Sequence, residues 1–148
     1  MLITKESILL ACDLKEKEAI IRAMAKQAFE IHRIKEVEPF VQAVLHREAE
    51  FSTGVGYGIA IPHGKASVVN EAFVMFCRVD HVDWNSLDGT DVDMVFMIGV
   101  PEEDTSNEHL KILALLSRRL MKEDFRTALR TAQSEDALLE ILKKWEII

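Results

Sequence analysis

The chain has 148 residues and a formal net charge of −7 at pH 7, from 25 acidic and 18 basic residues. Apolar residues make up 49% and charged residues 29%, which is typical of one globular domain and not of a disordered chain. The acidic balance argues against nucleic-acid binding, which depends on neutralising phosphates. No apolar run approaches the roughly 20 residues of a membrane span, and the N-terminus lacks the basic start and apolar core of a signal peptide. We therefore expect a cytoplasmic protein that is not inserted in the membrane.

The first third of the chain predicts two helices. Asp13 followed by Glu16 is a candidate capping box for a helix over residues 14–31, in which apolar side chains recur at helical spacing. The pair Glu38-Pro39 predicts the start of a second helix, because proline is tolerated in a first turn that needs no N–H donor. The charged segment 46–48 is expected to end it.

The middle of the chain predicts two long strands. Residues 72–79 and 92–100 are apolar at almost every position, as expected of central strands that are covered on both faces. Residues 83–89 between them have turn chemistry and close on Asp88-Gly89.

Three helices are predicted after the second strand. Thr105 with Glu108 is a candidate capping box for the first of them, which carries an apolar face up to Leu120. A shorter helix is expected over residues 123–130, and Ser134 is a natural N-cap for the last. Helices, then buried strands, then helices predict a single α/β domain over residues 1–148. Its expected architecture is a three-layer α/β/α sandwich with a mixed β-sheet.

The segment from Ser52 to Lys65 is the most unusual in the chain. Glycines at positions 54, 56 and 58 lead into the apolar run 59–61, and Pro62 then interrupts the strand. We expect a turn that feeds a brief strand, with the imidazole of His63 at its end. By this pattern, His63 is either a functional imidazole or a turn histidine with satisfied hydrogen bonds.

The residues around His63 bear on several kinds of site. His109 falls in a first helical turn, where it either donates to a bound anion or is buried against a backbone carbonyl. The glycine run lacks the preceding strand and following helix of a dinucleotide site. A zinc site would need His63, His109 and a carboxylate to converge, with no paired ligand motif to support it. No nucleophile elbow anchors a serine triad, which leaves the imidazole itself as the candidate nucleophile.

Residues 53–65, with the sequence TGVGYGIAIPHGK, closely resemble the phosphohistidine signature of a bacterial protein family. This family is the type-2 enzyme IIA domains of the phosphoenolpyruvate-dependent sugar phosphotransferase system, comprising the fructose, mannitol and nitrogen-regulatory groups. The resemblance covers nearly the whole chain, with further matching blocks at Arg47-Glu48, 82–89, 100–103 and 107–118. The downstream blocks look most like the fructose-specific branch.

The resemblance implies a function and a set of site residues. His63 would accept a phosphoryl group from the phosphocarrier protein HPr and pass it to a IIB component, whose acceptor in the fructose branch is a cysteine. Arg47 and His109 would stabilise the phosphoryl group, supported by a turn that includes Thr53, Gly54, Pro62 and Gly64. No metal or other cofactor is implied. No HPr-like, IIB or IIC segment is recognised in the chain, so we expect a free-standing IIA protein connected only indirectly to the membrane component IIC.

Three functional hypotheses remain open at this point. The first is a phosphoryl relay that serves sugar uptake, favoured by the fructose-like residues 84–87. The second is a regulatory module of the nitrogen-related group, which uses the same His63 but signals through its phosphorylation state. The third, a metal-dependent hydrolase, has little support. The sugar is not predicted, because the membrane component binds it.

Overall fold

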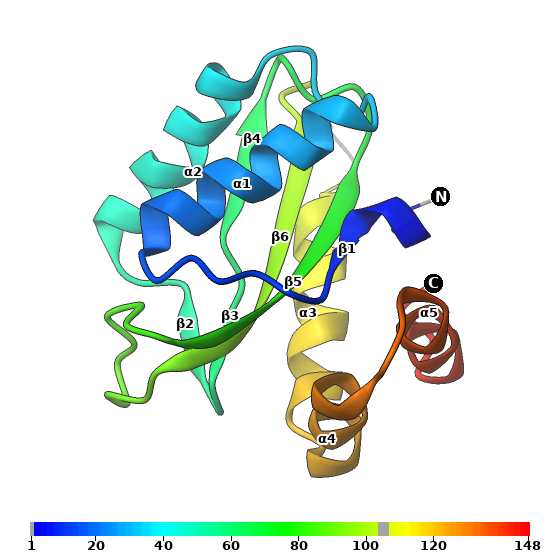
Figure 1. Cartoon of the computed structure of the whole chain (residues 1–148). Coiled ribbons are helices and arrows are strands. Elements are labelled where there is room, and N and C mark those ends of the chain that lie inside the picture. Colours follow the sequence, from blue (N-terminus) through cyan, green and yellow to red (C-terminus); the bar gives the residue numbers. More distant parts are fainter. Residues whose placement is uncertain (1, 104–106) are drawn as a thin grey trace.

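The computed structural model of the chain describes residues 2–103 and 107–148. Within these residues, one mixed sheet has the strand order β1-β5-β6-β3-β2, with β4 also paired to β6 (Figure 1). β5 and β6 are antiparallel, whereas β1 runs parallel to β5, and β3 and β4 run parallel to β6. The strands are β1 (Ile8–Leu9), β2 (Gly54–Gly56), β3 (Ile59–Ala60), β4 (His63–Ala66), β5 (Phe73–Val82) and β6 (Val92–Pro101).

Helices cover both faces of this sheet, so the predicted three-layer α/β/α sandwich is confirmed. One layer holds α1 (Lys17–Glu30) and α2 (Val37–Glu50). The opposite layer holds α3 (Glu108–Leu120), α4 (Glu123–Thr131) and α5 (Glu135–Lys144), with α5 beside the short 3-10 helix Lys5–Ser7 (Figure 1). Among the described residues, no helix combines the length and the apolar character needed to cross a membrane.

The two central strands build both cores, because successive side chains of a strand point to opposite faces. On β5, Phe73 and Met75 belong to the core under α1 and α2, whereas Val74 and Phe76 belong to the core under the C-terminal helices. All four side chains are fully buried. Burying an apolar side chain of this size stabilises the folded state by about 1.5–3 kcal/mol. The continuous apolar runs that were predicted as central strands therefore supply much of the stabilisation of the fold.

The first helix begins later than predicted. α1 starts at Lys17, and its N-cap residue Glu16 makes no side-chain capping bond, so the expected Asp13–Glu16 capping box is wrong. The chain before it stays extended beside β5, where the N–H of Cys12 donates to the carbonyl of Arg78 at 3.4 Å. This contact with the sheet favours an extended chain before Lys17 over the helical turn that the capping pattern predicted.

The other helix boundaries follow the sequence more closely. Pro39 lies in the first turn of α2 as predicted, although α2 continues to Glu50. The hydroxyl of Ser134 accepts a hydrogen bond from the N–H of Ala137 at 3.1 Å, which confirms it as the N-cap of α5. The capping box predicted at Thr105 lies outside the described residues.

Two glycines let α2 approach the sheet closely. Gly64 of β4 and Gly99 of β6 are register partners. A Cβ atom on Gly64 would lie 3.0 Å from Cγ2 of Val44, and one on Gly99 would lie 2.5 Å from Cζ of Phe73 and 3.1 Å from Cε1 of Phe40. The flat surface formed by this pair brings the C-terminal half of α2 against the start of β4.

Gly99→Ala is expected to destabilise the fold by about 1–3 kcal/mol, because the added methyl group overpacks two buried phenyl rings. Urea unfolding should show a lower midpoint with an unchanged slope. Leu87→Ala is the control, since this side chain is 88% exposed, and its unfolding free energy should stay within about 0.5 kcal/mol of the parent. Parental stability of Gly99→Ala would contradict the close packing described here.

Candidate functional site

His63 is the first residue of β4, and Ile61 and Pro62 separate β4 from β3. Both short strands pair with the same edge of β6, and the carbonyl of Pro62 accepts a hydrogen bond from the N–H of Ile98 at 3.0 Å in the gap between them. The brief strand ends before Pro62 as expected, but a second strand that was not predicted begins at His63. Pairing with β6 resumes at His63 and holds its backbone in the sheet.

The alternating glycines form a hairpin between β2 and β3. Its turn residues Tyr57 and Gly58 both have positive φ, at 59° and 77°, as a tight two-residue hairpin requires. The guanidinium of Arg130 donates to the carbonyl of Tyr57 and forms an ion pair with Asp93. The glycine run is thus an anchored hairpin that leads to His63, and β2 is a strand that the sequence did not predict.

The imidazole of His63 is half-buried and contacts the backbone of Ile61, two residues earlier in the chain. Nδ1 lies 3.0 Å from the carbonyl oxygen of Ile61. A carbonyl only accepts, so Nδ1 carries the proton, and a neutral ring in this tautomer has its lone pair on Nε2. The backbone therefore selects the nitrogen that is able to act as a nucleophile.

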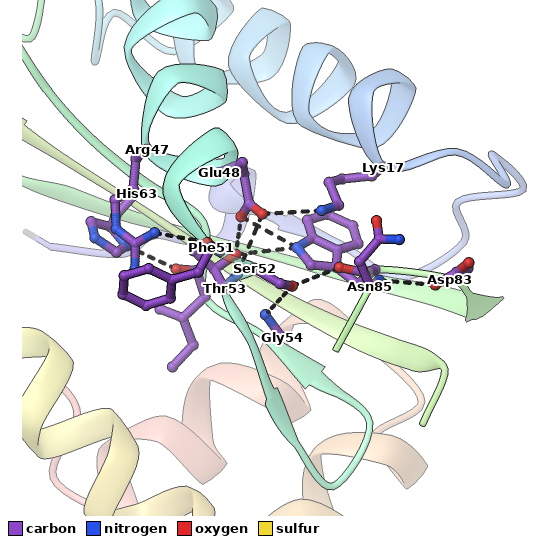
Figure 2. Close-up of polar contacts among 12 residues, drawn as sticks. Lys17, Arg47, Glu48, Phe51, Ser52, Thr53, Gly54, His63, Asp83 and Asn85 are labelled. Atoms are coloured by element: carbon purple, nitrogen blue, oxygen red, sulfur yellow. Dashed lines mark hydrogen bonds and ion pairs between the residues drawn. The ribbon is translucent and has the colours of Figure 1, made fainter. Parts of the chain in front are cut away.

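Arg47 in the last turn of α2 lies beside His63 (Figure 2). Its Nη1 donates to the carbonyl of Phe51 at 2.9 Å, and its Cζ lies 4.2 Å from the centroid of the Phe51 ring. A cavity of about 190 Å³ adjoins them, lined by Ala43, Arg47, His63, Gly64, Lys65 and Val100. The structure thus brings three predicted site residues together around one cavity, and a guanidinium at its wall suits an anion.

Two further predicted residues, Thr53 and Gly54, lie at the start of the hairpin that precedes His63. Thr53 accepts a hydrogen bond on its carbonyl from the N–H of Ile61 at 3.0 Å. Gly54 packs against the loop after β5, where a Cβ atom would lie 2.9 Å from Cβ of Ser86. The side chain of His109 lies outside the described residues, so its participation stays a prediction.

Two residues at the site were given no role from the sequence. Lys65 lines the same cavity and lies two positions after His63 on β4, hence on the same face of the strand. Strand periodicity would have pointed to it if residues 63–66 had been predicted as a strand. Glu48 is a buried carboxylate next to Arg47, and no local pattern marks it as buried.

Among the described residues, no group of three or more His, Cys, Asp and Glu side chains is arranged to hold a metal ion. The alternative that joins His63 and His109 in such a site involves a side chain outside those residues.

The family model described as phosphoenolpyruvate-dependent sugar phosphotransferase system, EIIA 2, matches residues 1–145. The chain belongs to this EIIA family. It is 42% identical over 144 residues to the fructose-specific EIIABC component of Bacillus subtilis, covering 97% of this chain but only 22% of that relative. It is also 36% identical over 142 residues to the nitrogen regulatory protein of Bradyrhizobium diazoefficiens, covering 95% of this chain and 92% of that one.

Solved EIIA structures share the fold. The nitrogen regulatory protein IIA-Ntr of Neisseria meningitidis superposes with a TM-score of 0.88 at 27% identity, covering 95% of this chain and 96% of that one. The mannitol enzyme IIA of Escherichia coli, solved in complex with phosphorylated enzyme IIB, gives a TM-score of 0.81 at 27% identity, covering 96% and 97%. EIIA domains are phosphotransferase components, so phosphoryl transfer is the chemistry that a functional site in this chain has to explain.

Proposed function

We propose that this EIIA domain is a phosphoryl relay for sugar uptake of the fructose type. His63 accepts the phosphoryl group from phosphorylated HPr and delivers it to the cysteine of a cognate IIB component. The observation that carries the proposal is the hydrogen bond between Nδ1 of His63 and the Ile61 carbonyl, beside a cavity that Arg47 also lines. It leaves Nε2 as the acceptor nitrogen.

The transfer is an in-line displacement at phosphorus. The lone pair of Nε2 forms the new N–P bond while the N–P bond to the donor imidazole of HPr breaks. The ring becomes positively charged, and the Ile61 carbonyl stabilises it through the proton on Nδ1. In the second step the IIB thiolate attacks, the bond between Nε2 and phosphorus breaks, and His63 returns to its neutral form. Neither step uses a metal or a nucleotide.

Charge stabilisation supplies most of the catalysis, because the transition state of phosphoryl transfer is loose. Arg47 presents forked donors to the equatorial oxygens. We assign the same task to Lys65, which lines the cavity, and to His109 in the first turn of α3, where the positive end of the helix dipole favours an anion. Thr53, Gly54, Pro62 and Gly64 support this arrangement from the backbone.

A nitrogen-related regulatory role is the second candidate. The observation that favours it is the Bradyrhizobium diazoefficiens relative, a nitrogen regulatory protein of which this chain covers 92%. In that role the same His63 would be phosphorylated, and the phosphorylation state would be read by a partner protein. The 42% identity to a fructose-specific component favours transport.

Phosphorylated HPr and a panel of purified IIB proteins test the proposal. The chain should acquire acid-labile, alkali-stable phosphate from HPr, as a phosphohistidine does, and then lose it to a fructose-type IIB protein. Label that enters the chain but moves to no IIB protein would favour the regulatory role. Failure to take up phosphate from HPr would overturn the relay altogether.

A further inference from the structure

The residue that follows Arg47 in α2, Glu48, has a buried carboxylate. The side chain of Glu48 is only 5% exposed, although it is charged and lies near the end of α2. Lys17 Nζ lies 3.2 Å and the Thr53 N–H 3.3 Å from one oxygen, and the Trp84 indole N–H lies 3.3 Å from the other (Figure 2). The Thr53 hydroxyl also donates to it. Every contact is donated to Glu48, which is the pattern an ionised carboxylate accepts.

A continuous line of hydrogen bonds connects this carboxylate to the imidazole. Glu48 accepts from both the N–H and the hydroxyl of Thr53, which fixes that residue in place. The carbonyl of Thr53 accepts from the N–H of Ile61 at 3.0 Å. The carbonyl of Ile61 in turn accepts from Nδ1 of His63 at 3.0 Å. A shift of the Thr53 turn would therefore be transmitted to the tautomer and orientation of the ring.

The same carboxylate fixes the part of α2 that carries the arginine. Glu48 is the neighbour of Arg47 in sequence, and its bonds join the helix to the turn five residues later. Trp84 strengthens this junction, since its indole N–H also lies 3.1 Å from the Thr53 hydroxyl. Glu48 thus belongs to the end of α2, which carries Arg47, and contacts the Thr53 turn, which leads to His63.

We propose that Glu48 is a positioning residue for phosphoryl transfer. It holds the Thr53 turn so that the Ile61 carbonyl stays on Nδ1 of His63, which keeps Nε2 as the acceptor nitrogen, and it fixes the end of α2 beside it. The kinetic part of this inference rests on the proposed function, whereas the orientation of the ring does not. A purely structural role would lower stability without changing the tautomer of His63.

Four variants separate these roles. Glu48→Gln keeps the shape but cannot accept from all the donors, and Thr53→Val removes the hydroxyl link without changing the volume greatly. Asp93→Asn is the matched control, because it breaks a partly buried ion pair with Arg130 (2.8 Å) at the far end of the hairpin. Thr53→Ser restores the hydroxyl and serves as the conservative rescue.

The first readout needs no partner protein. Nitrogen-15 NMR of the His63 ring should show a dominant Nδ1–H tautomer in the parent, Asp93→Asn and Thr53→Ser, and a mixture of tautomers in Glu48→Gln and Thr53→Val. The second readout is single-turnover transfer from phosphorylated HPr at varied HPr concentration. The maximal rate should fall roughly 10- to 100-fold in Glu48→Gln and Thr53→Val, with the half-saturating concentration little changed.

Two results would overturn the inference. One is a folded Glu48→Gln protein with the parental His63 spectrum and the parental rate. The other is an equal change of spectrum and rate in Asp93→Asn, which would indicate general loosening of the fold. A parent protein that takes up no phosphate would overturn the proposed function instead, and the NMR comparison would still decide whether Glu48 holds the ring.

Discussion

His63→Ala is expected to abolish phosphate uptake from HPr completely, because among the described side chains no other imidazole is held in this way beside the cavity of Arg47 and Lys65. The variant should give no acid-labile label at any HPr concentration, whereas the parent is labelled. His63 is only half-buried at the start of a short strand. The unfolding midpoint of the His63→Ala variant should therefore stay close to that of the parent. Phosphate transfer followed by mass spectrometry of the intact protein measures the effect.

His81→Ala is the control for this experiment. The side chain of His81 is 73% exposed, and its Nε2 lies 3.9 Å from the carboxylate of its neighbour Asp80. Its removal should leave labelling unchanged. If His63→Ala still took up acid-labile phosphate, the nucleophile would be another residue, and the role assigned to the Ile61 carbonyl would fail with it.

The central part of the fold could be predicted because its signals are local. The apolar runs of β5 and β6 mark strands buried on both faces, and the helical periodicities mark the layers that cover them. The strands β2 and β4 were missed for the opposite reason. Gly54–Gly56 and His63–Ala66 have little apolar pattern, and their conformation comes from pairing with distant partners, β3 and β6 respectively.

In the candidate site, too, the features with a local sequence signal could be predicted, and those that depend on distant contacts could not. His63 could be singled out because the glycines and the proline before it are unfavourable in a regular strand. The family resemblance pointed to Arg47. The tautomer of His63 could not be predicted, because it depends on where the Ile61 carbonyl points after β3 and β4 pair with β6. The burial of Glu48 could not be predicted either, since its donors come from segments up to 36 residues away. Contacts of this kind exist only once the sheet and α2 are assembled.

The second large effect is expected at Arg47. Its guanidinium stacks on the Phe51 ring, with Cζ 4.2 Å from the ring centroid, and donates to the Phe51 carbonyl at 2.9 Å. A planar cation held in this way is able to keep that backbone contact and still present donors toward the cavity. Because phosphoryl transfer depends on neutralising the equatorial oxygens, Arg47→Ala should slow transfer from HPr by about 100-fold or more.

Arg47→Lys distinguishes charge from geometry. Lysine keeps the positive charge but loses the flat stack and the forked donors, so its transfer rate should lie between those of the parent and Arg47→Ala. Arg22→Ala is the control, because Arg22 is a partly exposed arginine on α1 that pairs with Glu18 and Glu38 away from the cavity. Stopped-flow measurement of single turnovers gives the rates of the parent and of the three variants. If Arg47→Ala transferred as fast as Arg22→Ala, Arg47 would have no part in stabilising the phosphoryl group, and Lys65 and His109 would have to supply that charge without it.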